Sequence, residues 1–199
     1  NGAGKSTLLR ILATLIKPTK GSIEIGGMQY PQQRGLIRSI TGYLGHQYFL
    51  YGDLTPKENL RFHANLFNVE NVETRIKEVL EIVGMQSVAN RRVKTFSNGM
   101  QKRISLARAL IHKPKILLLD EPEAGLDQES LTLLEKALKG SQEGGACVVM
   151  ATHDLDFGLN FSSRAVLLRQ GRIIDDTPSR TTNPEKMKGL LRLHDEFVP

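Results

Sequence analysis

Apolar positions along the chain recur with two periods, and each period predicts a different kind of element. Apolar residues three or four positions apart are typical of one face of a helix that packs against a core. This spacing predicts helices over residues 6–16, 72–83, 100–111, 128–138 and the segment after residue 184. A further helix is indicated by its start, because Thr55 and Glu58 form a capping box around Pro56, and we expect it to run to about residue 67.

Strand-like segments lie between these helices. Short alternating or continuous apolar runs are found in SIEIGG, RSITGYLGHQ, KILLLDEP and CVVMATHD. ILLLD is apolar up to its last residue, which is typical of a strand buried on both faces of a parallel sheet. RAVLLRQGRIIDD predicts a hairpin that turns at Gln170 and Gly171. The single cysteine, Cys147, lies in CVVMATHD, so we expect a packed thiol there rather than a ligand or a nucleophile.

Three predicted helices follow one another without a strand, whereas strands and helices alternate before and after them. This order predicts an α/β core with an inserted helical lobe. Within a single domain of residues 1–199, we expect residues 1–50 and 112–199 to form the core and residues 51–111 the helical subdomain. No apolar run approaches the roughly 18 residues of a membrane-spanning helix, so we expect any membrane-spanning part to belong to another chain.

The formal net charge is +6, and the segment from Arg91 to Lys115 is basic without a single acidic residue. Such a segment is typical of a solvated basic face. A nearby anionic nucleotide or an acidic membrane surface are the alternatives that the charge leaves open.

The chain begins with NGAGKST, which matches the end of the phosphate-loop pattern G-x-x-x-x-G-K-[ST]. On this match the first glycine falls before Asn1, so we expect the chain to be N-terminally truncated. The glycines let backbone N–H groups approach phosphate oxygens, and the following helix directs its positive end at them. Lys5 is suited to the β- and γ-phosphates, Ser6 to Mg²⁺ and Thr7 to the α-phosphate. The predicted ATP-binding residues of this loop are Asn1, Gly2, Ala3, Gly4, Lys5, Ser6 and Thr7.

A second motif places two carboxylates at the end of the ILLLD strand. Asp120 and Glu121 come at the carboxyl end of a predicted parallel strand, where open α/β sheets bind their ligands. We expect Asp120 to orient Mg²⁺ through its water shell and Glu121 to act as general base on the attacking water. Two acids that merely open a turn before Pro122 would be the simpler interpretation without the phosphate loop. Together the two motifs predict nucleotide hydrolysis.

Six motifs in this order resemble the ATP-binding subunits of ABC transporters, over essentially the whole chain. The matching segments are NGAGKST for the Walker A loop, GHQ for the Q-loop, FSNGM for the LSGGQ signature, ILLLDEP for Walker B, AGLD for the D-loop and ATHD for the switch region. The resemblance implies an α/β fold of the P-loop NTPase (RecA-like) class, with a mostly parallel sheet and an inserted α-helical subdomain. It also implies ATP and Mg²⁺ as cofactors, and an adenine-stacking aromatic residue in the segment before Asn1.

The resemblance assigns roles to residues that are ambiguous when taken singly. Gln47 would sense Mg²⁺ and couple it to the membrane partner, although it could be an ordinary polar loop residue. His153 would contact the γ-phosphate and help to position water, although a structural histidine is the simpler interpretation. Asp127 would face the partner subunit, and it could also cap the helix that follows it.

The signature segment departs from LSGGQ at Phe96, Asn98 and Met100. The resemblance implies that Ser97 and Gly99 close on the γ-phosphate bound by the opposite subunit. We expect Asn98 to replace the first glycine, because asparagine tolerates positive φ better than most residues. Met100 lacks the hydrogen-bonding side chain of glutamine, which leaves the strength of the cross-subunit contact open.

The resemblance implies a homodimer of ATP-binding subunits and a multi-spanning membrane permease, with the chain at the cytoplasmic face of the cell membrane and no nucleic-acid partner. The interval between Gln47 and Ser97 has room for a compact helical lobe but not for a long coiled coil, which disfavours chromosome-maintenance and DNA-repair ATPases. A regulatory module that binds ATP without hydrolysing it is the alternative of another class, and the presence of Glu121 and His153 disfavours it.

Within the transporters, HQYFLYGDLTPKENLRF and the segment from KTFSNGM to AGLD are similar to the haem exporter ATP-binding subunit of cytochrome c biogenesis. A drug or lipid exporter is the alternative. Four aromatic residues, Tyr43, Tyr48, Phe49 and Tyr51, surround Gln47. They could pack the junction with the helical lobe, or form the groove that in this family receives a short helix of the membrane subunit.

Overall fold

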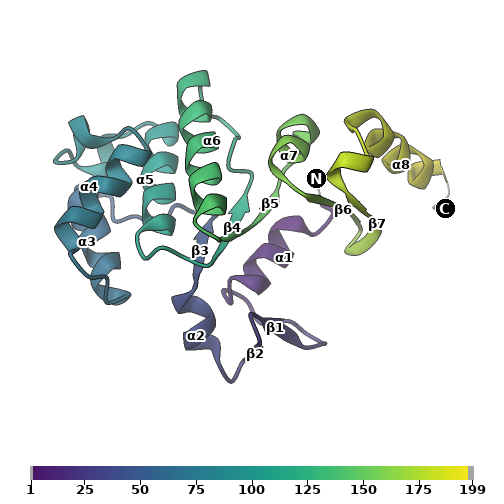
Figure 1. Cartoon of the computed structure of the whole chain (residues 1–199), viewed down its shortest axis with the longest axis horizontal. Coiled ribbons are helices and arrows are strands. Elements are labelled where there is room, and N and C mark those ends of the chain that lie inside the picture. Colours follow the sequence, from purple (N-terminus) through teal and green to yellow (C-terminus); the bar gives the residue numbers. More distant parts are fainter. Residues whose placement is uncertain (1, 197–199) are drawn as a thin grey trace.

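A three-stranded parallel sheet in the order β3-β4-β5 lies at the centre of the computed structural model (Figure 1). The structure describes residues 2–196, with side chains through residue 190. The strands are β3 (Thr41–Leu44), β4 (Ile116–Asp120) and β5 (Cys147–Ala151). Leu44 pairs with Leu119, and Asp120 pairs with Ala151, so the three strands end at the same edge of the sheet.

Successive residues of β4 contact two separate hydrophobic clusters. Leu118 packs with Leu9 of α1 (Lys5–Leu12) on one face of the sheet. Leu117 and Leu119 join the larger cluster on the other face, which includes residues of the helices α3 to α6. The prediction that ILLLD is buried on both faces is therefore confirmed.

The three helices predicted between the two halves of the core are present and lie together at one side of the molecule in Figure 1. They are α3 (Pro56–Leu66), α4 (Val72–Ile82) and α5 (Asn98–Leu110). The capping box is formed as expected: Glu58 N–H donates to Thr55 Oγ1 over 3.3 Å, and Thr55 N–H donates to Glu58 Oε2 over 2.7 Å. The hydrophobic cluster continues from these helices into the sheet, and the division at residues 51–111 stays a prediction.

The segment between α1 and β3 differs from its prediction. SIEIGG contributes only β1 (Ile23–Ile25), which pairs with an unpredicted strand, β2 (Met28–Tyr30). The signal for this hairpin was the Gly-Gly turn, whose two glycines have φ of 58° and 77°. The start of RSITGYLGHQ belongs to a short helix, α2 (Arg34–Ser39). A tertiary contact accompanies this helix, because the Arg38 guanidinium donates to the side chain and the carbonyl of Thr14.

The C-terminal third contains the two predicted helices and the predicted hairpin, together with one helix that was not predicted, α7 (Leu155–Phe161). Its other elements are α6 (Gln128–Glu143), β6 (Arg164–Arg169), β7 (Arg172–Pro178), α8 (Pro184–Glu196) and a short 3₁₀ turn at Ser179–Thr181. Two further 3₁₀ turns, Gln86–Val88 and Val93–Thr95, lie between α4 and α5. The β6–β7 hairpin turns at Gln170 and Gly171, which have φ of 45° and 75°, as predicted.

The prediction of a packed thiol at Cys147 is wrong, because this residue is exposed. In the part of the chain that the structure describes, β5 pairs with β4 alone and forms an edge of the sheet. Alternate residues of β5, Cys147 and Val149, lie on the face opposite the larger cluster and remain exposed, while Ala151 on that same face joins the smaller cluster. An apolar run thus identified the strand without revealing which of its faces is covered.

Candidate nucleotide-binding site

The phosphate loop has the backbone conformation that its glycines allow. Gly2 and Gly4 have φ of 80° and 96°, in the left-handed region that favours glycine. Gly4 is the N-cap of α1 and offers no side-chain cap, so the first N–H groups of this helix are left for a ligand. Asn1 lies outside the described residues. The loop is also supported from the hairpin, because Gly171 N–H donates to the Ala3 carbonyl over 2.9 Å.

The structure brings together two of the three predicted magnesium-binding residues, Ser6 and Asp120, while no hydrogen bond joins Gln47 to them among the described residues. Ser6 Oγ donates a hydrogen bond of 3.0 Å to Asp120 Oδ1, although the two residues are 114 positions apart in the sequence. The Asp120 side chain is 1% exposed. A hydroxyl and a carboxylate, completed by phosphate oxygens and water, form the kind of site that Mg²⁺ usually occupies beside a nucleotide. The donor set therefore fits Mg²⁺.

The predicted base and the switch histidine also meet. His153 Nδ1 lies 3.4 Å from Glu121 Oε1, and the His153 side chain is largely exposed. Glu121 has an unusual backbone for a non-glycine residue, with φ of 49°. Its N–H donates to the Ala151 carbonyl over 2.8 Å, which ties it to the end of β5. The carboxylate thus stands at the common edge of β4 and β5, next to Asp120.

The signature segment forms the start of α5. Ser97 is the N-cap and accepts a 3.3 Å hydrogen bond from Met100 N–H. The expectation of positive φ at Asn98 is wrong, because this residue is the first of the helix and is absent from the described residues with positive φ. Among the described residues, no hydrogen bond or ion pair joins Ser97, Asn98 or Gly99 to the phosphate loop of the same chain.

Two other predicted residues lie on loops. Gln47 is exposed, three residues beyond the end of β3. Asp127 caps α6 and accepts a 2.8 Å hydrogen bond from Ser130 N–H, so the capping interpretation is confirmed. This hydrogen bond lowers the pKa of Asp127 below its usual value.

Three polar residues near the site were not singled out from the sequence. His46 Nε2 lies 3.7 Å from Asp120 Oδ2, and the parallel register of β3 and β4 could have indicated this proximity. Glu123, which is buried, accepts a hydrogen bond from the Thr152 hydroxyl. Lys102 is buried and donates to two carbonyls of the turn after β4, so the expectation of a solvated basic face from Arg91 to Lys115 is wrong at this residue.

The aromatic residues around Gln47 divide between packing and a surface cavity. Tyr43 and Phe49 line a cavity of about 220 Å³ between the sheet and the ends of α1, α3 and α5. Phe49 is 43% exposed, and the Arg108 guanidinium lies 5.5 Å from the centre of its ring. The Tyr48 carbonyl accepts a hydrogen bond from Ser105. The cavity lining is basic, because it includes Arg38 and Arg108 and no acid.

Comparison with known proteins places these motifs in one family. A family model described as "ABC transporter" matches residues 1–124. The chain is 33% identical to the ABC transporter ATP-binding protein NatA of Bacillus subtilis, over 87% of the chain and 72% of NatA. It is 35% identical to the phosphonates import ATP-binding protein PhnC of Shigella flexneri, over 96% of the chain and 81% of PhnC. Against four other relatives, the chain spans between 57% and 63% of their length.

Solved structures agree with this result. The ATP-binding subunit of an ABC transporter superposes with a TM-score of 0.88 at 25% identity, over 96% of this chain and 85% of the other. A dimeric cassette described as a post-hydrolysis state bound to ADP and Pi superposes with a TM-score of 0.80 at 29% identity, over 89% of this chain and 82% of the other. The family model covers more than half of the chain, and the motifs lie on the fold that they predicted. The chain belongs to the ABC transporter family and has its P-loop ATPase fold, with a mostly parallel sheet and an inserted α-helical subdomain.

Proposed function

We propose that this chain binds MgATP and hydrolyses it to power transport through a separate membrane subunit. The observation that carries the proposal is the convergence of the Ser6–Asp120 pair and the Glu121–His153 pair at one edge of the sheet. The α1 N–H groups and the Lys5 ammonium would bind the phosphates, with Thr7 next to them. Mg²⁺ held near Ser6 and Asp120 would neutralise charge on the β- and γ-phosphate oxygens.

In this proposal Glu121 is the general base. Its carboxylate accepts the proton of the attacking water, while His153 holds the carboxylate on one side and orients the γ-phosphate on the other. Gln47, exposed beyond β3, would help to hold Mg²⁺ when the nucleotide is bound. Positioning and electrostatic stabilisation supply most of the rate enhancement in phosphoryl transfer, so small displacements of these groups should lower kcat strongly.

The test is Glu121→Gln, with Glu143→Gln at the exposed end of α6 as the matched control. Removal of the base should lower kcat by a factor of at least about 100 while ATP binding persists, because the amide cannot accept the proton. Phosphate release and equilibrium binding of a fluorescent ATP analogue measure the two quantities. Turnover like that of the Glu143→Gln control would overturn the assignment.

We also infer a homodimer in which Ser97, Asn98 and Gly99 of one subunit face the phosphate loop of the other. The support is that these residues stand at the exposed start of α5, and no hydrogen bond joins them to the phosphate loop of their own chain among the described residues. A Cβ built on Gly99 would lie 3.7 Å from the carbonyl oxygen of Gly125, two residues before Asp127 of the D-loop. Mixing Ser97→Arg with Lys5→Ala subunits leaves one intact composite site per heterodimer. Recovery of ATPase activity is expected, and no recovery in confirmed heterodimers would contradict the arrangement.

We propose that the partner is a multi-spanning permease, which would hold the chain at the cytoplasmic face of the membrane. We propose no nucleic-acid partner. Among the described helices, none is both long and apolar enough to cross a bilayer. The 220 Å³ cavity beside Phe49 would receive a short helix of the permease, and its basic lining favours a helix that presents an acidic side chain. Aromatic side chains are common anchors at such interfaces.

The cavity assignment is tested with Phe49→Ala, and Ile173→Ala on the exposed face of β7 is the control. Phe49→Ala should leave the basal ATPase activity of the isolated chain within about twofold but reduce the amount of multi-spanning membrane protein that co-purifies with it. Equal co-purification for both variants would contradict the assignment.

The transported substrate that we propose is haem, for cytochrome c biogenesis, with export of a drug or a lipid as the alternative. The support is the similarity of the loops around Gln47 and Ser97 to haem exporter subunits. Deletion of the gene should abolish holo-cytochrome c assembly, and complementation with the intact gene should restore it. Normal assembly after complete deletion would rule out haem export while leaving the ATPase proposal intact.

A further inference from the structure

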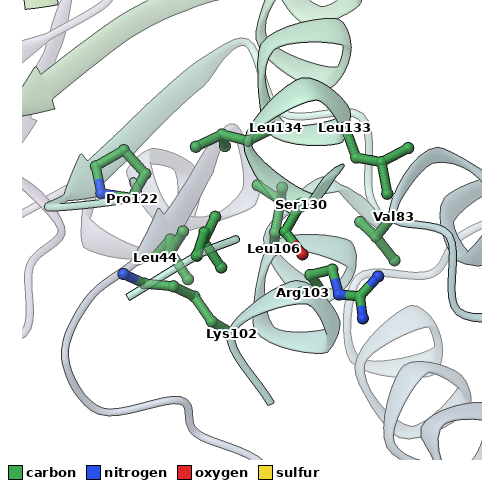
Figure 2. A pocket seen from close by; sticks show the side chains of 10 residues that line it. Leu44, Val83, Lys102, Arg103, Leu106, Pro122, Ser130, Leu133 and Leu134 are labelled. Carbon is green, nitrogen blue, oxygen red and sulfur yellow. The ribbon is translucent and has the colours of Figure 1, made fainter. Parts of the chain in front are cut away.

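Lys102 makes a contact that joins the signature helix to the segment carrying the proposed base. Its ammonium donates 2.7 Å and 2.6 Å hydrogen bonds to the carbonyl oxygens of Glu121 and Ala124. The residue is 8% exposed, although lysine is rarely buried without partners. Figure 2 shows its side chain extending past Leu44, while the neighbouring Arg103 points to the opposite side.

The position of Lys102 on α5 links this contact to the signature segment. The residue lies one helical turn after Asn98, so its Cα moves with the cap residue Ser97 when the helix moves as a rigid body. On the same turn, a Cβ built on Gly99 would lie in van der Waals contact with the Gly125 carbonyl oxygen, at 3.7 Å. The first turn of α5 therefore packs directly on the turn that follows β4.

Glu121 occupies a backbone conformation that needs support. A φ of 49° costs free energy for a non-glycine residue and persists when its surroundings hold it in place. Its N–H is held by Ala151 and its carbonyl by Lys102 and by Ala124 N–H, the latter over 3.2 Å. These contacts fix the peptide groups on both sides of the Cα, and thus the direction in which the carboxylate leaves the chain.

The charges around Lys102 explain why a cation is retained there. Burial lowers its pKa, whereas the carboxylates of Glu123, Glu121 and Asp120 act in the opposite direction. Glu123 in turn accepts a hydrogen bond from Thr152, the residue before His153. The ammonium is thus the centre of a polar cluster whose outer members are the predicted catalytic groups.

We propose that Lys102 is a positioning residue that fixes Glu121 and transmits movement of the signature segment to the base of the same chain. The inference rests on the proposed role of Glu121. Closure of the dimer on the nucleotide would press on residues 97–99, and Lys102 would carry that displacement to the Glu121 carbonyl. The base would then reach its working position only when the opposite site is occupied.

The substitution that isolates the ammonium is Lys102→Met. The lysine stem borders a cavity of about 10 Å³ whose lining includes Leu44, Leu106 and Leu134, so a methionine side chain fits without overpacking. Lys136→Met, at an exposed position of α6, is the matched control. Steady-state ATPase kinetics, equilibrium binding of a fluorescent ATP analogue and thermal unfolding are measured on the full-length protein.

Lys102→Met should lower kcat by about 10- to 100-fold and leave nucleotide binding within about twofold of the control, because a small displacement of a catalytic group is costly while the phosphate loop is untouched. Lys102→Arg should recover part of kcat, since its guanidinium can donate to both carbonyls. A kcat for Lys102→Met equal to that of Lys136→Met would overturn the proposal. Should Lys102→Met not fold, Lys102→Gln decides, because its shorter, uncharged side chain cannot replace the ammonium: normal binding with reduced kcat supports the role, and unchanged kcat overturns it.

A double variant separates positioning from a purely structural role. If Lys102 acts through Glu121, adding Lys102→Met to Glu121→Gln should lower the residual turnover no further. A multiplicative loss in the double variant would indicate an independent structural effect and would overturn the proposal. Full turnover in Glu121→Gln alone would instead refute the proposed base, so the two failures are distinguishable.

Discussion

Gly42 lies where β3 packs against the end of α5, and we predict that Gly42→Ala destabilises the fold. A Cβ built at this position overlaps the carbonyl oxygen of Ala109, and it lies 3.0 Å from Pro114 Cγ and 3.1 Å from Leu117 Cδ1. The first of these atoms belongs to the helix backbone, so it cannot be relieved by a change of rotamer. The strand and the helix must move apart, and β3 leads directly to Gln47.

The expected magnitude follows from two opposing effects. Overpacking of a buried site costs about 1–3 kcal/mol, and a fixed backbone neighbour favours the upper end. Loss of glycine flexibility in the unfolded chain offsets about 0.4–1 kcal/mol of this cost. We therefore expect the free energy of unfolding to fall by about 2 kcal/mol, which corresponds to a drop in Tm of about 4–8 °C for a chain of this size.

The matched control is Gly140→Ala in the interior of α6, where an added Cβ meets no heavy atom within 4 Å. Alanine is the better helix former, so the free energy of unfolding of this variant should rise by about 1 kcal/mol. Urea denaturation of both variants measures the difference, which should be about 3 kcal/mol. Equal stability of Gly42→Ala and the wild type, together with a gain in Gly140→Ala, would refute the close approach of β3 and α5.

Two further predictions concern stability. Burial, with Arg108 nearby, lowers the pKa of His63 and of His112 from 6.5 to about 4. The unfolded chain therefore binds more protons than the folded one between these values, and the free energy of unfolding should fall as the pH decreases from 6.5 toward 4. The double variant with glutamine at both histidines should show a weaker dependence in denaturation at pH 7 and pH 5, and an unchanged dependence would contradict the argument. Asp127→Ala removes the capping side chain that accepts a hydrogen bond from Ser130 N–H, so it should lower the free energy of unfolding in urea by about 1 kcal/mol. Asp127→Asn should lower it by less than half of that amount.

Local signals in the sequence were sufficient for most helices and for the order of the strands. The capping box at Thr55 and the Gly171 hairpin need only neighbouring residues, so their geometry follows from short segments. The helix after Asp127 was underestimated in length, and the short helix α2 was missed. In α2 no apolar period is long enough to be recognised, and the Arg38–Thr14 contact comes from a distant part of the chain.

The family, the order of the motifs and the residue types that they bring to a nucleotide follow from the amino-acid sequence alone. These depend on spacing along the chain, which is visible without any structure. The folded structure was needed to show that Ser6 contacts Asp120, that Glu121 has a left-handed backbone, and that Cys147 is exposed. It also revealed the Lys102 contact, because the partners of a buried amine are carbonyl oxygens, which every residue possesses. Burial and backbone hydrogen bonding are properties of packed elements, and no local pattern of side chains encodes them.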